Sequence, residues 1–211
     1  FVLHTVLIEV WWSGWRVWVS RAGVSDLRLP EGVNLTPLAS PFDTRGDLTE
    51  IFRQSWTGDF HPLQWNLVRS EANTLRGFHV HPRHYDYLVM IDGAMQLALK
   101  DLRPGSPTEN LATTLILDAT VPASIAIPPG VGHGFYFPDK AMHIYSVSEY
   151  WSREEEIGCR WDDPELGIAW GAPDATLSPR DATAGAYREM VADYVARTEC
   201  LLPEEAGIIR A

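Results

Sequence analysis

Between residues 34 and 150 the chain is divided into short runs typical of β-strands, and this pattern constrains the fold more than any other feature. Turn signals such as Asp92-Gly93, Pro104-Gly105 and Pro128-Pro129-Gly130 separate the runs. The expected strands are 64–70, 74–81, 85–91, 95–101, 111–117, 123–127, 133–137 and 142–150. Many short strands at this spacing predict an all-β sandwich or barrel, and a jelly roll is one such architecture.

The chain beyond residue 150 has a different character. Residues 151–180 are rich in Trp and Pro and are expected to pack on the barrel without regular structure. Residues 183–198 are expected to form one amphipathic helix. Its apolar residues fall at i, i+3, i+4, i+7 and i+8, at Tyr187, Met190, Val191, Tyr194 and Val195. We therefore predict an all-β jelly-roll barrel over residues 31–182 and a C-terminal helix and tail over 183–211.

Residues 1–30 fit neither of the usual N-terminal templates. The first 19 residues are apolar, but they contain His4, Glu9 and Arg16. A membrane span needs about 20 apolar residues with few or no charges, and a signal peptide needs a basic start and a small-residue cleavage site. We expect an edge strand or a stretch that is not native, and treat residues 1–30 as an atypical N-terminal extension.

Charge and cysteine content exclude several classes of protein. The formal net charge is −11 and the chain has no basic tract, which argues against a protein that tracks nucleic-acid phosphates. Cys159 and Cys200 form neither a disulfide framework nor a zinc cluster. We expect reduced thiols in a cytoplasmic protein with no membrane partner.

Two motifs carry histidines toward what would be the barrel interior. Residues 75–86 contain His79, His81 and His84. Side chains on a strand repeat with period two, so His79 and His81 should share a face. A turn rich in Pro and Gly then leads His133 into another strand. Alone, these motifs are also consistent with solvated histidines and ordinary turn chemistry. Together they resemble the two motifs of the cupins, which are small β-barrels, through His79, His81, Asp86, Gly93 and His133.

A closer resemblance covers about residues 34–185. Block by block and in order, the chain is similar to the dTDP-4-dehydrorhamnose 3,5-epimerase family, a branch of the cupins. The blocks that carry the match are FDTRGDLTE at 42–50, QWN at 64–66, LRGFH at 75–79, DLR with SPT at 101–108, IPPGVGHGF at 127–135, Tyr145 with Tyr150, WDDPELGIAW at 161–170 and LSPRD at 177–181.

The resemblance implies a reaction and the residues for it. The family's substrate is a nucleotide-linked 4-keto-6-deoxy sugar, whose C4 ketone acidifies the protons at C3 and C5. By resemblance His79 is the base, Asp181 orients it, and Tyr145 is the opposing acid. The implied substrate-binding residues are Arg45, Glu50, Gln64, Asn66, Arg76, His133 and Tyr150. The family also implies no cofactor, a homodimer, and a place in deoxysugar or polysaccharide biosynthesis.

Other interpretations remain open from the residues themselves. Asp181 could cap the following helix, and Tyr145 could be an ordinary strand tyrosine. Where the family has a Lys near the developing enolate, this chain has Asp86. A three-His, one-carboxylate set suits a divalent transition metal, so a metal-dependent cupin of isomerase or dioxygenase type is one alternative. Its expected ligands are His79, His81, Asp86 and His133. A non-catalytic sugar-nucleotide-binding cupin is another alternative.

Overall fold

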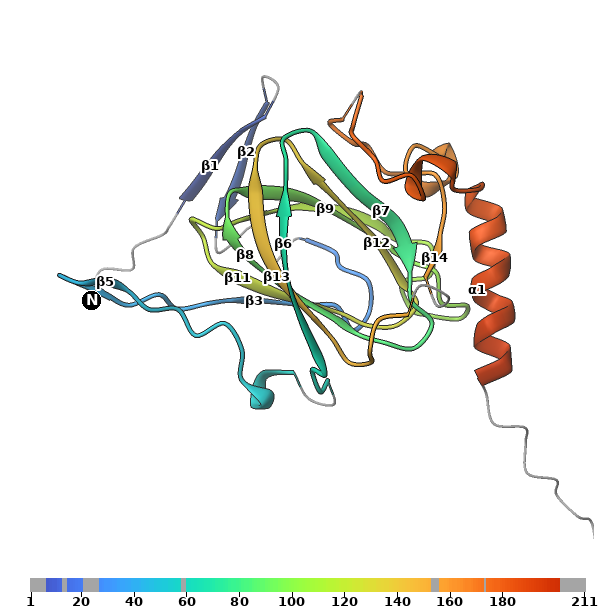
Figure 1. Cartoon of the computed structure of the whole chain (residues 1–211), viewed down its shortest axis with the longest axis horizontal. Helices are drawn as coiled ribbons and strands as arrows, with labels where there is room; N and C mark the ends of the chain where they lie inside the picture. The colour runs from blue at the N-terminus through green and yellow to red at the C-terminus, as the bar shows by residue number, and fades with distance from the viewer. Residues whose placement is uncertain are drawn as a thin grey trace, which may run out of the picture.

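The computed structural model describes residues 7–12, 15–20, 27–57, 60–152, 156–172 and 174–201. Its centre is a jelly roll of two five-stranded antiparallel sheets (Figure 1). One sheet has the order β10-β9-β12-β7-β14 and the other β3-β11-β8-β13-β6. The strands are β3 (Asn34–Pro37), β6 (Gln64–Ser70), β7 (Thr74–Val80), β8 (Asp86–Asp92), β9 (Ala94–Asp101), β10 (Ala112–Asp118), β11 (Ala123–Ile127), β12 (Val131–Phe137), β13 (Ala141–Val147) and β14 (Ile157–Gly158). The predicted fold class and all eight predicted strands are confirmed.

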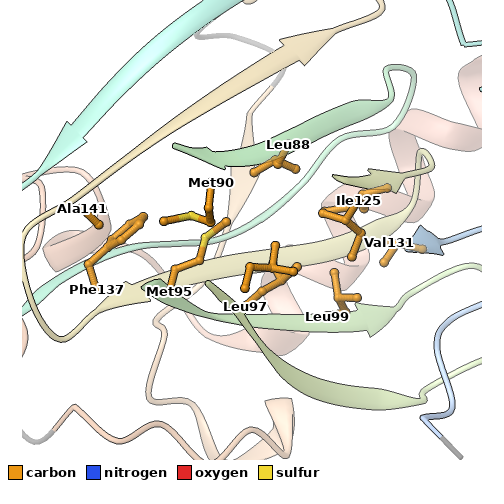
Figure 2. Close-up of a cluster of buried hydrophobic side chains, with 11 residues drawn as sticks. Leu88, Met90, Met95, Leu97, Leu99, Ile125, Val131, Phe137 and Ala141 are labelled. Carbon is orange, nitrogen blue, oxygen red and sulfur yellow. The ribbon is translucent and has the colours of Figure 1, made fainter. Parts of the chain in front are cut away.

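An apolar core fills the part of the interior between β8, β9 and β11. Figure 2 shows side chains from the two sheets, such as Met90 and Met95, pointing toward one another. Leu97, Leu99 and Ile125 complete this region and are fully buried. Because these residues occupy one part of the barrel, the strands on the other side can line a cavity.

The C-terminal helix covers the outer face of the sheet that contains β7. Helix α1 (Tyr187–Leu201) buries Tyr187, Met190 and Tyr194 against Phe78 and Val80 (Figure 1). The apolar face predicted from the spacing is therefore the face that packs. With Phe78 and Val80 turned toward α1, the alternation along β7 turns His79 inward.

The segment before the helix is more regular than expected from its composition. It contains β14, which pairs with β7, and two single turns of 3-10 helix, η3 (Pro164–Leu166) and η4 (Asp181–Thr183). Trp161 and Trp170 pack together on Leu75, as the sequence predicts. This packing brings residues 176–181 to the mouth of the barrel.

Two hairpins lie apart from the barrel sheets. Strands β1 (Leu7–Trp12) and β2 (Trp15–Ser20) form a two-stranded sheet of their own rather than an edge of the barrel. Strands β4 (Phe42–Asp43) and β5 (Gly46–Asp47) form a small hairpin that extends away from the barrel (Figure 1). Among the described residues, no helix has the length and apolar character needed to cross a membrane. Cys159 is a free, buried thiol, and the side chain of Cys200 lies outside the described residues.

Candidate active site

A cavity of about 680 Å³ opens between the two sheets. Strands β6, β7, β8, β12 and β13 form its walls, and residues 176–181 form its rim. Five of the residues expected at the site line it: His79, Arg76, His133, Tyr145 and Asp181. Residues more than 100 positions apart in the sequence thus meet around one space.

Glycines set the position of β7 and of His79. Gly77 has a φ of 116°, and a Cβ there would lie 2.8 Å from Cα of Gly134 on β12. A Cβ on Gly158 would lie 2.8 Å from Cδ2 of His79. Glycine alone allows such close contact at these two positions. The imidazole therefore sits directly against the backbone of β14.

His79 and Asp181 form a hydrogen-bonded pair. Nε2 of His79 lies 2.8 Å from Oδ1 of Asp181, and the backbone N–H of Gly77 donates to Oδ2 at 3.5 Å. Asp181 is buried in η4 and directs its side chain at His79 rather than at the N-terminus of α1. The structure thus brings together the base and the orienting carboxylate predicted from the sequence.

Arg180 competes for the same nitrogen of His79. Nη2 of Arg180 lies 2.7 Å from Nε2 of His79. The guanidinium can donate a hydrogen bond to this nitrogen only if the nitrogen carries no proton. Asp181 requires a proton on Nε2, because a carboxylate only accepts. We assign the proton to the contact with Asp181, since Arg180 also has an ion pair with Glu156. In this tautomer Nδ1 carries the lone pair that can accept a proton, and Nη2 of Arg180 lies 3.5 Å from it.

The environment keeps Asp181 ionised. Burial raises the pKa of its carboxyl, but the hydrogen bond and charge of His79, the bond with Ser178 and the nearby Arg180 outweigh burial. The pKa of Asp181 therefore lies below its usual value. A carboxylate held ionised in this position fixes the tautomer of the imidazole and stabilises the imidazolium that forms when it takes a proton.

Tyr145 lines the cavity from the opposite sheet. It lies on β13, whereas His79 lies on β7. Burial and the nearby Asp86 raise the pKa of the Tyr145 phenol, and Arg76 partly offsets this effect. The phenol is therefore protonated at neutral pH and can donate a proton toward the cavity.

A second group of ionisable side chains surrounds Asp86. Its Oδ2 lies 3.8 Å from Nε2 of His81, 3.8 Å from Nε2 of His84 and 3.7 Å from Nε2 of His133. All four residues are buried. The metal set expected from the sequence is His79, His81, Asp86 and His133. In the structure the ligand atoms of His81, His84 and Asp86 lie within 4.8 Å of one another, and the ring of His84 stacks on His81 at 4.0 Å. Nε2 of His79 instead contacts Asp181 and Arg180.

Burial keeps the imidazoles of this group neutral. It lowers the pKa of His84 to about 4, with help from Arg83, and lowers the pKa of His133 to about 3. The pKa of His81 falls well below its usual value for the same reason. Burial also raises the pKa of the Asp86 carboxyl to about 8.

The remaining expected substrate-binding residues lie outside the cavity wall of this single chain. Gln64 donates to Asn66 on β6 at 3.0 Å. Arg45 pairs with Asp43 in the hairpin that extends from the barrel, Glu50 pairs with Arg53, and Tyr150 is 72% exposed. Their roles in binding the nucleotide stay predictions.

The sequence reasoning missed several residues of the cavity. Arg180 contacts His79, and Glu156 holds Arg180. His143 is buried beside Tyr145 on β13, with its ring stacked on Phe137. The alternation along 142–150 places His143 on the same face as Tyr145 and could have identified it. The matching block at 177–181 includes Arg180 without giving it a role, and no local pattern marks Glu156, because the irregular segment positions both side chains.

The fold and the site define a cupin-type jelly roll whose cavity is lined by a hydrogen-bonded His–Asp pair and a tyrosine. Comparison with known proteins makes this specific: the chain belongs to the dTDP-4-dehydrorhamnose 3,5-epimerase family, an isomerase family whose model matches residues 27–189. This confirms the resemblance inferred from the sequence blocks.

Individual relatives agree with the family match. A dTDP-4-dehydro-6-deoxyglucose 3-epimerase of Streptomyces is 34% identical over 140 residues, covering 64% of this chain and 71% of that protein. A dTDP-4-dehydrorhamnose 3,5-epimerase of Neisseria gonorrhoeae is 32% identical over 167 residues, covering 75% of this chain and 50% of that protein. The chain thus spans half the length of the Neisseria relative.

Solved structures show the same architecture. A 4-keto-6-deoxy sugar epimerase from the novobiocin gene cluster of Streptomyces spheroides superposes with a TM-score of 0.70 at 31% identity, covering 85% of this chain and 93% of that one. The dTDP-6-deoxy-D-glucose-3,5-epimerase of Legionella pneumophila, solved in complex with dTDP-4-keto-L-rhamnose, gives 0.72 at 27% identity, covering 78% and 92%.

Proposed function

We propose that the protein is an epimerase of a nucleotide-linked 4-keto-6-deoxy sugar that inverts C3, C5 or both. The observation that carries this proposal is the pair formed by His79 and Asp181, which faces the same cavity as Tyr145. The family match supports this function over the two alternatives considered from the sequence.

The chemistry follows from the two walls of the cavity. Nδ1 of His79 takes a proton from a carbon beside the C4 ketone, and the electron pair moves into an enolate. Tyr145 returns a proton to that carbon. Its phenolate then regains a proton from solvent, and the imidazolium of His79 releases its proton to solvent. Because His79 and Tyr145 come from facing sheets, the proton leaves from one face of the sugar and returns to the other, which inverts the carbon. The ketone of the substrate supplies the acidity, so we propose that no organic cofactor is needed.

The substrate-binding proposal combines residues that line the cavity with residues outside its wall. Arg76 lines the cavity and can bind the diphosphate with its guanidinium. Gln64 and Asn66 lie on β6 and can bind the sugar or the nucleotide. Arg45, Glu50 and Tyr150 are proposed nucleotide contacts, and His133 a contact inside the cavity.

We also propose a homodimer in the cytoplasm. Phe42 on β4 and Trp65 and Leu67 on β6 are large apolar side chains that are 87%, 43% and 50% exposed. A second copy of the chain that covers these side chains would bury them. The free, buried thiol of Cys159 is in keeping with a reducing compartment. Light scattering coupled to size-exclusion chromatography measures the mass in solution, and a monomer at micromolar concentration would contradict the dimer.

The test of the function is proton exchange at carbon. The protein is incubated with dTDP-4-keto-6-deoxyglucose in heavy water, and mass spectrometry counts the deuterium atoms bound to carbon. Uptake of one deuteron indicates a single epimerase, and uptake of two a double one. No uptake by folded protein that binds the nucleotide would refute the proposal.

A pair of variants assigns the exchange to the site. His79→Ala removes the base and should abolish uptake. His61→Ala, which changes an exposed histidine, should exchange at the parent rate. Full turnover in His79→Ala would exclude His79 as the base.

A further inference from the structure

The geometry points to a binding site for one divalent transition-metal ion, which we propose is formed by His81, His84, Asp86 and His133. The ligand atoms of the first three lie within 4.8 Å of one another. Three imidazole nitrogens and one carboxylate oxygen are a donor set that favours ions such as Zn²⁺ or Co²⁺ over Mg²⁺ or Ca²⁺.

The spacing of these atoms fits an ion better than direct hydrogen bonds. The three Nε2 atoms lie 3.7 to 3.8 Å from Oδ2 of Asp86, beyond the range of an N–H···O hydrogen bond. Ligand atoms at about 2.1 Å from a tetrahedral ion are about 3.4 Å apart. Closing the group around an ion would therefore require side-chain movement, most of all at His133, which lies outside the set of ligand atoms that are within 4.8 Å of one another.

The protonation pattern of His133 suits a ligand. Its Nδ1 lies 3.2 Å from the carbonyl oxygen of Val131, which can accept the Nδ1 proton. This bond leaves the lone pair on Nε2, the atom that faces Asp86. Hydrogen bonds of this kind fix the tautomer of metal-binding histidines in other proteins.

His84 supplies an independent observation. Its side chain is 4% exposed, and among the described residues its Nε2 has no hydrogen-bond partner. A buried polar atom without a partner carries a desolvation cost of roughly 1–3 kcal/mol. A metal ion at this position would satisfy it.

The site leaves the proton-transfer residues free. His79 is bound to Asp181 and is not one of the four ligands, although it pairs with His133 across β7 and β12. An ion bound here would place positive charge in the cavity beside the base, where it can stabilise an enolate oxygen as a Lewis acid. This catalytic consequence rests on the proposed function, whereas binding of the ion does not.

The first experiment measures binding alone. The protein is stripped with a chelator and titrated with Co²⁺, and the visible ligand-field absorption and the metal content after desalting are recorded. We expect about one ion per chain and the spectrum of a site with nitrogen ligands. Metal content no greater than that of an unrelated protein without this cluster would refute the site.

Variants then locate the ion. His84→Asn and Asp86→Asn should each raise the Kd for Co²⁺ by about 100-fold or more, because even the hydrogen-bond partners of ligands contribute 10–100-fold. His61→Asn should bind like the parent. Circular dichroism shows whether each variant is folded, and the Co²⁺ spectrum of the parent tests the site without any variant. Equal affinity in the parent and in folded His84→Asn would overturn the assignment.

Deuterium uptake separates this site from the proposed function. If the ion binds but neither the stripped nor the loaded protein exchanges, the site stands and the proposed function fails. If the stripped protein exchanges and no ion binds, the function stands and the site fails. A loaded protein that exchanges at least about tenfold faster than the stripped one supports the catalytic consequence, and equal rates refute it while leaving the site in place.

Discussion

Replacement of Asp181 by Asn tests the base most directly. The amide has nearly the shape of the carboxylate, so it can keep the contact with Nε2 of His79, which is now 2.8 Å from Oδ1. It cannot keep the negative charge. The variant therefore removes the electrostatic support for an imidazolium while preserving the packing of a buried side chain.

The size of the effect can be worked out from the contact. An imidazolium on His79 would place its charge about 4 Å from that of Asp181, and two such charges interact by about 4 kcal/mol at an effective dielectric constant near 20. Each tenfold change in rate corresponds to about 1.4 kcal/mol. We therefore expect Asp181→Asn to lower the rate of deuterium uptake by about 10³-fold, within the range measured for general acid–base residues.

The assay compares initial rates of deuterium uptake at saturating sugar nucleotide. Asp92→Asn makes the same chemical change at an exposed position on β8 and should match the parent. Thermal unfolding shows whether Asp181→Asn is folded at the assay temperature. A folded variant within about threefold of the parent rate would refute the role of Asp181 in supporting the base.

Three further changes test other parts of the site. Tyr145→Phe should leave deuterium exchange at carbon largely intact, because His79 can still remove the proton. It should lower formation of the inverted sugar, measured by NMR, by about 100-fold, because the acid that returns a proton to the other face is lost. Inversion at the parent rate would exclude Tyr145 as the acid. Burial lowers the pKa of His143 from 6.5 to about 4. The contribution of the buried, neutral imidazole to the free energy of unfolding is therefore complete above pH 6.5 and is lost as the pH falls through 4. The loss amounts to up to about 3 kcal/mol. His143→Phe, which keeps a ring against Phe137, should therefore show a smaller fall in melting temperature between pH 7 and about pH 4, and an unchanged fall would refute this. Gly77→Ala would place a Cβ 2.8 Å from Cα of Gly134 at a residue with positive φ. We expect the free energy of unfolding to fall by at least about 2 kcal/mol, which corresponds to roughly 4–8 °C in melting temperature. An unchanged melting temperature would contradict the close contact.

The strands were predictable because their signal is local. Turn residues interrupt apolar runs, and the alternation along β13 correctly places His143, Tyr145 and Val147 toward one space. The spacing on α1 identified the face that packs on the barrel. Very short pairings such as β14 carry too few residues to form a pattern, and they depend on tertiary contact with β7.

The site was predictable only where a local motif marks it. The period of a strand places His79 and His81 on one face, and the structure confirms that both line the cavity. Asp181, the partner of His79, lies 102 residues away in the sequence, so no spacing rule could pair the two residues. The family resemblance supplied that assignment. Arg180 lies in the matching block at 177–181, but the resemblance assigned no role to it.

The exchange of His79 for His84 in the candidate metal set shows what a linear pattern leaves out. The period of two along a strand gives His79 and His81 equal access to the cavity. From the sequence alone, His79 is both the expected base and an expected metal ligand, and it cannot be both. In three dimensions Asp181 and Arg180 take up the Nε2 atom of His79, and the turn after His81 folds His84 back onto Asp86. Proton abstraction and metal binding exclude each other if both need His79. They are compatible if His79 is the base and His84 is the metal ligand. One cavity can therefore hold both the proposed base and the proposed cation.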